Sequence, residues 1–83
     1  MYKVIQDGAV IATVDSIVFI FYGDNQAYQE CPEEQACGFC IKIPKSFVDD
    51  ITGETVEISV DTVFQFPNKQ LKGTEPIAEY IVV

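Results

Sequence analysis

The sequence predicts an all-β protein, a small antiparallel sandwich or partly open barrel with one short helix near residues 32–37. The first observation behind this prediction is a series of short runs rich in β-branched and aromatic residues. Gly, Pro, Asn and Asp separate them, as is typical of strands joined by turns. The second is the apolar–polar alternation of residues 55–60, the pattern of a strand with one buried face. With 83 residues, the chain is expected to form a single β-rich domain over residues 1–83.

Two strands at residues 2–6 and 9–14 open the chain. The Asp7-Gly8 pair between them favours a type I′ turn, because glycine tolerates the positive φ that this turn requires, so we expect an antiparallel hairpin. Residues 16–22 form the next strand. Their continuous β-branched and aromatic side chains predict either burial on both faces or a central place in the sheet.

The middle of the chain is predicted to be a turn, a short strand and a short helix. Residues 23–26 carry the turn, and the strand covers residues 27–31. Pro32 suits the first position of a helix at residues 32–37, because its missing N–H costs nothing there. Gly38 suits the position just after the end of that helix.

A strand at residues 39–43 should follow the helix, with Phe39 and the two isoleucines on one face. Cys40 and Lys42 would then lie on the other face, because side chains alternate along a strand. Proline cannot donate to a ladder of hydrogen bonds, so Pro44 is expected to end this strand.

The segment at residues 44–54 has two interpretations. Either Ser46 caps a short helical turn there, or the segment is a loop. Two further strands are expected after it, at residues 54–60 and 62–66, the second ending at Pro67.

The last strand, at residues 77–83, is apolar up to its final residue. It is either buried in the sheet or open to a partner, because an exposed apolar edge invites pairing with another chain. Tyr80, Ile81 and Val82 are therefore the candidate interaction residues.

The charge of the chain excludes several function classes. Thirteen acidic residues stand against five lysines, for a net charge of −8, and there is no arginine or histidine. Such a surface repels phosphate backbones and anionic lipids, so we expect no nucleic acid and no membrane as partner. Without histidine there is no Ser-His or Cys-His nucleophile pair, and without arginine no bidentate clamp for an anionic substrate. The sequence therefore predicts a protein that is not an enzyme and uses no cofactor.

Cys31, Cys37 and Cys40 follow the spacing C-x5-C-x2-C. A structural zinc site needs about four Cys or His ligands, so these three would need a carboxylate such as Glu33 or Glu34, or a second chain. A C-x-x-C pair is also typical of redox proteins, but there the start of a helix lowers the thiol pKa, whereas Cys37 is expected at a helix end. We therefore predict structural thiols and no metal site. A metal- or thiol-dependent protein that uses the three cysteines is the alternative.

The thiols are expected to be reduced. Residues 1–8 lack the apolar stretch of a secretory signal, and an odd number of cysteines argues against a secreted disulfide scaffold. Both observations predict a cytoplasmic protein.

The opening, MYKVIQDGAVIATVD, resembles the start of a group of small uncharacterised proteins encoded in prophages and phages of Gram-positive gut bacteria. The resemblance covers about residues 1–43. It continues with an aromatic-rich strand, a Gly/Asn turn and a stretch that stands here as Tyr28, Cys31, Pro32, Glu33, Ala36 and Gly38. Residues 44–83 depart from the group, apart from the closing IAEYIVV. Cys37 and Cys40 are departures as well, because only the Cys31 position recurs in the group.

The resemblance implies a virion-accessory or assembly role, since members are encoded near tail and lysis genes. Combined with the missing catalytic chemistry, it predicts a non-enzymatic, phage-derived accessory or assembly protein that acts by protein–protein interaction. The expected partner is a phage tail or virion protein, and the chain is expected to be a homo-oligomer. Its expected location is the cytoplasm of the bacterial host or the virion.

Overall fold

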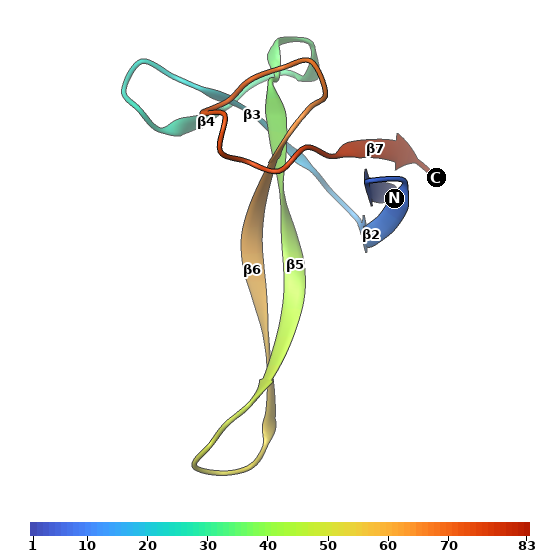
Figure 1. Cartoon of the computed structure of the whole chain (residues 1–83), viewed down its shortest axis with the longest axis vertical. Helices are drawn as coiled ribbons and strands as arrows, with labels where there is room; N and C mark the ends of the chain where they lie inside the picture. The colour runs from blue at the N-terminus through green and yellow to red at the C-terminus, as the bar shows by residue number, and fades with distance from the viewer.

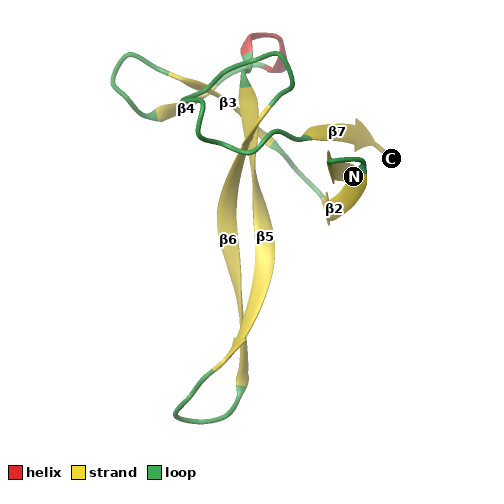
Figure 2. Cartoon of the chain, viewed as in Figure 1, coloured by secondary structure: helices red, strands yellow, loops and turns green.

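Two antiparallel sheets make up the structure, a computed structural model that describes all of residues 1–83. The prediction of an all-β fold is confirmed, and Figure 2 shows strands joined by loops with a single helical turn. The first sheet has the strand order β2-β1-β7 and the second the order β4-β3-β5-β6 (Figure 1). The strands are β1 (Tyr2–Gln6), β2 (Ala9–Val14), β3 (Val18–Tyr22), β4 (Tyr28–Glu30), β5 (Gly38–Val48), β6 (Thr55–Gln65) and β7 (Glu79–Val82).

The first hairpin forms as predicted, with β1 and β2 antiparallel. Asp7 and Gly8 have φ values of 52° and 80°, so both central residues of the turn lie in the positive region that a type I′ turn requires. The prediction for the next strand is confirmed in part. Strand β3 is central, between β4 and β5, but it begins at Val18, and Ile20 is its one buried residue.

The predicted helix at residues 32–37 is one 3₁₀ turn, Glu33–Gln35. The helix ends after one turn because the next backbone N–H groups do not continue the helical hydrogen-bond pattern. The Ala36 N–H closes the turn on the Glu33 carbonyl, and the Cys37 N–H then donates to the Ile20 carbonyl of β3. The hydrogen bond to β3 therefore takes the place of the one that would begin a second helical turn.

The prediction that Pro44 ends a strand is wrong, because β5 runs through Pro44 to Val48. The Asp49 N–H donates to the Glu54 carbonyl, and hydrogen-bonded pairs alternate along an antiparallel ladder. The backbone nitrogen of Pro44, paired with Ser59, therefore points away from β6, where no N–H is needed. A proline on an open strand edge is tolerated for this reason.

Both interpretations of residues 44–54 are also wrong for their first half, which is strand, and a turn covers residues 49–54. The Asp49 carboxylate accepts hydrogen bonds from the Ile51 N–H at 2.8 Å and the Thr52 N–H at 3.3 Å, which fixes the turn. The two strands expected at residues 54–60 and 62–66 are a single strand, β6.

The core lies between the two sheets. Its buried side chains come from β1, β5, β6 and the segment before β7: Val4, Phe39, Ile41, Phe64 and Ala78. Phe39 has no solvent exposure and stacks on Phe64, with ring centroids 5.5 Å apart. We call the part of the molecule around this core, in which the two sheets pack together, the body. Figure 1 shows that the body occupies one end of the molecule and that β5 and β6 continue well beyond it.

Candidate protein-interaction surface

The most prominent feature of the molecule is a two-stranded arm, which we define as residues 42–61. It consists of the outer parts of β5 and β6 and the turn that joins them (Figure 1). Strand β3 pairs with β5 only through residues 38–40, and β6 is the last strand of its sheet. Both long edges of the arm are therefore unpaired. An isolated two-stranded ribbon is only marginally stable in water, and further packing on one of its faces would stabilise it.

One face of the arm is apolar. Residues opposite each other in an antiparallel pair share a face, and the pairs Ile43–Val60, Lys45–Ile58 and Phe47–Val56 lie on one side. We call this side the arm face; its apolar members are Ile43, Phe47, Val56, Ile58 and Val60. The pairs on the opposite face are mostly polar: Lys42–Asp61, Pro44–Ser59, Ser46–Glu57 and Val48–Thr55.

The arm face continues the core-forming face of the body. Phe39, Ile41 and Phe64 project from the same side of β5 and β6, and there the β2-β1-β7 sheet buries them. Ile43, the next residue on this side, is half-buried and still packs against the core, and exposure increases farther along the arm. Phe47 is 50% exposed and Ile58 46% exposed. A contiguous apolar surface of this kind on a small protein typically marks an interaction site.

The edges of the arm are less suited to pairing than its face. The backbone N–H and carbonyl of Gln65 bond outward, to Pro76 and Ala78, so by alternation the groups of Glu57, Ser59 and Asp61 also point outward. The outward positions of β6 thus carry two carboxylates, and the outer side of β5 carries Pro44. Charges and proline on an open edge discourage strand addition.

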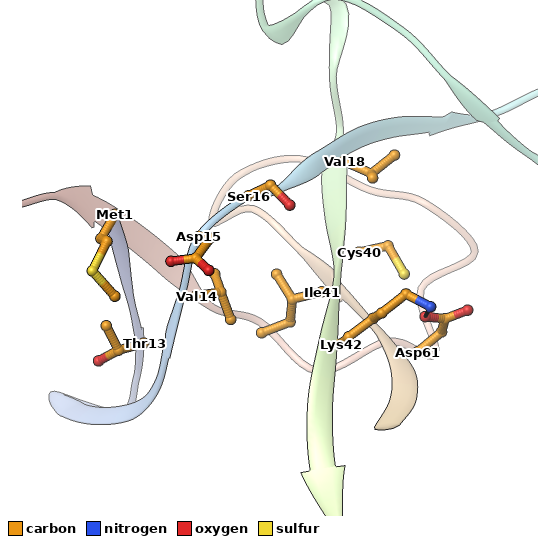
Figure 3. Close-up of a pocket in the computed structure, with 10 residues that line it drawn as sticks. All are labelled: Met1, Thr13, Val14, Asp15, Ser16, Val18, Cys40, Ile41, Lys42 and Asp61. Atoms are coloured by element: carbon orange, nitrogen blue, oxygen red, sulfur yellow. Dashed lines mark ion pairs between the residues drawn. The ribbon is translucent and has the colours of Figure 1, made fainter. Parts of the chain in front are cut away.

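At the base of the arm lies a cleft of about 450 Å³. Figure 3 shows it between the end of β2, at Val14 and the following Asp15, and the β5 residues Cys40, Ile41 and Lys42. Lys42 forms an ion pair of 3.7 Å with Asp61 at its rim. Cys40 is the one thiol in the cleft. Burial, and next the nearby Asp61 carboxylate, raise the pKa of this thiol, which keeps it in the weakly nucleophilic protonated form.

The three cysteines are not gathered with other side chains into a group of potential metal ligands. No group of three or more Cys, Asp or Glu side chains is arranged to hold a metal ion. All three thiols are free and half-buried. The backbone N–H groups of Cys31 and Cys37 bond to neighbouring carbonyls of β3, and Cys40 lies on β5 opposite Val18 and Val63. Burial and the adjacent Cys37 raise the pKa of Cys31, the reverse of what a reactive thiol needs.

The predicted interaction residues Tyr80, Ile81 and Val82 lie on β7, at the edge of the first sheet. Ile81 and Val82 are 47% and 73% exposed. Tyr80 packs with Tyr2, Phe19, Phe39 and Phe66, and its hydroxyl donates to the Glu33 carboxylate. The terminal strand is thus paired with β1 on one side and open on the other, and Tyr80 joins the two sheets.

Tyr80 is expected to ionise late. Burial, then the hydrogen bond to Glu33, raise its pKa to about 12, above the usual value of 10.0. Its stabilising contribution is therefore complete below the unfolded-state value of about 10 and is lost as the pH rises toward 12. Absorbance titration at alkaline pH should show a late-ionising tyrosine that disappears in Tyr80→Phe. An unchanged curve in that variant would contradict the assignment.

The arm face is not predicted from the sequence when Pro44 is assigned to the end of a strand. The sequence does carry a signal, because every second residue is apolar from Phe39 to Phe47 except Lys45, and from Val56 to Phe64 except Thr62. Two matched alternating runs around a six-residue polar turn predict a hairpin if Pro44 is allowed an edge position.

No family model, no curated protein and no solved structure matches this chain. None of its helical turns is long and apolar enough to cross a bilayer.

Proposed function

We propose that the protein is a non-enzymatic interaction protein that binds another protein through the arm face. The carrying observation is the continuation of the core-forming face of β5 and β6 beyond the body, where Phe47 and Ile58 are about half exposed to solvent. Leaving such side chains exposed forfeits the free energy of burial, about 25 cal/mol per Å². A partner that covers the arm face recovers this free energy.

Two further observations support the proposal. The net charge of −8 disfavours nucleic acids and anionic membranes as the covering partner. The cleft at the arm base offers no histidine, and its thiol has a raised pKa, so it lacks an activated nucleophile. The phage origin, a tail or virion protein as partner, and a place in the host cytoplasm or the virion stay predictions of the sequence resemblance.

Site-specific photo-crosslinking in living cells tests the proposal. Replacing Phe47 by p-benzoylphenylalanine preserves an aromatic ring on the arm face, and irradiation should convert part of the chain into a covalent protein adduct. The same replacement at Ser46, the neighbour on the polar face, serves as the matched control. We expect adducts from position 47 and few or none from position 46. Equal yields at the two positions, or no adduct at either, would overturn the proposal.

A further inference from the structure

We infer that the partner covering the arm face is a second copy of this chain, packed with its arm antiparallel and face to face. This inference rests on the proposed function and names its partner. Three properties of the arm carry it: the distribution of charge along its length, the position of the body, and the apolar area that the two faces offer.

Charge is distributed unevenly along the arm. The half near the body carries Lys42 and Lys45 on β5 against Glu57 and Asp61 on β6, so it is close to neutral. The turn at the tip carries Asp49, Asp50 and Glu54 and no basic residue. An antiparallel pair of arms sets each acidic tip against the lysines of its partner, whereas a parallel pair sets acid against acid.

Lys45 fits this arrangement in a second way. It is the one charged side chain on the arm face, and the single ion pair within the chain joins Lys42 to Asp61. Lys45 therefore has no carboxylate partner of its own. Its aliphatic stem can lie on the apolar face while its ammonium group reaches past the open edge of β5 toward an acidic tip.

The body also selects the antiparallel orientation. The β2-β1-β7 sheet covers the inner end of the same face, over Phe39, Ile41 and Phe64. In a parallel pair, the two copies of this sheet would occupy the same space. In an antiparallel pair, each sheet lies beyond the partner's tip, and the exposed Ile51 arrives near the partner's arm base, beside the cleft of Figure 3.

The available area fits a reversible dimer. Closing two arm faces on each other, with Ile51 of each tip, removes on the order of 1,000 Å² from solvent, the lower limit of specific interfaces. The two-fold relation also makes the contact self-limiting, because each copy offers one arm face and uses it. We therefore expect a dimer that dissociates on dilution, with no larger assembly.

Sedimentation equilibrium over a concentration series, from about 1 μM to about 1 mM, tests this inference across the range of weak to moderate affinities. The wild-type chain should move from the 9.3 kDa monomer to a species of twice that mass. Ile58→Asp should weaken the dimer more than about a hundredfold, because a carboxylate would be buried on an apolar surface. Ser59→Asp adds the same charge to the next residue, on the polar face, and should leave the dimer nearly unchanged.

A charge exchange tests the orientation. Lys45→Glu should weaken the dimer, and adding Asp50→Lys and Glu54→Lys to the same chain should restore it, with circular dichroism confirming that each variant is folded. A monomer at every concentration, a trimer or larger species, equal effects of Ile58→Asp and Ser59→Asp, or failure of the exchange to restore binding would each overturn the inference. A wild-type monomer that still gives position-47 adducts with another protein would overturn the second copy as partner and leave the proposed function standing.

Discussion

Replacing Phe39 by alanine is expected to remove about 4 kcal/mol from the free energy of unfolding, the usual cost of deleting a buried aromatic ring. Phe39 has no solvent exposure and touches rings on three sides, with centroids 5.5 Å from Phe64, 5.3 Å from Phe66 and 6.0 Å from Tyr80. Removing the ring would delete these contacts and leave a cavity in the core between the two sheets. Since small domains are stable by only about 5–15 kcal/mol, much of the stability would be lost. Urea denaturation followed by circular dichroism measures the change.

Phe47 supplies the matched control for this prediction. It lies on the same strand and the same face as Phe39 but is 50% exposed on the arm. Phe47→Ala should cost less than about 1 kcal/mol, as is usual for exposed positions. All variants should carry Ile58→Asp, so that dimer formation does not add to the measured stability. Equal losses from the two phenylalanines would contradict the placement of the core.

Replacing Gly38 by alanine is expected to destabilise the protein by about 3 kcal/mol, the upper part of the range for overpacked cores. Gly38 is buried at the start of β5, and a Cβ there would collide with the carbonyl oxygen of Phe64 and the side chain of Leu71. The carbonyl belongs to the paired strand and cannot move without breaking the β5–β6 ladder. Urea denaturation in the Ile58→Asp background again measures the change.

Gly23→Ala is the control for the Gly38 variant. A Cβ at Gly23 would meet only the end of the Gln29 side chain, which can rotate away. We expect a change within about 0.5 kcal/mol, typical of substitutions outside the core. A loss at Gly23 as large as that at Gly38 would show that the loss of glycine flexibility, and not the collision, sets the cost.

The sequence by itself determined the strand content and the first hairpin. Local rules suffice there, because Asp7-Gly8 fixes a turn whose neighbours in sequence are also neighbours in space. The faces of residues 39–43 were likewise correct, since alternation along a strand depends only on the backbone. The absence of histidine and arginine, which argued against an enzyme, was also visible without coordinates.

Only the tertiary structure decided how far the strands extend and where the apolar side chains end. A proline breaks a strand if its nitrogen faces a paired strand, and it is tolerated if the nitrogen faces an open edge. Which of the two holds for Pro44 depends on its register with Ser59 of β6. Gly38 looked like a helix end, yet its role is set by the Phe64 carbonyl from a distant part of the chain. The arm face exists because burial on this side of β5 is nearly complete at Ile41 and partial at Ile43, whereas Phe47, farther out, is 50% exposed. Alternating apolar residues look the same in sequence whether a second sheet covers them or solvent does, because burial is a property of the packed molecule.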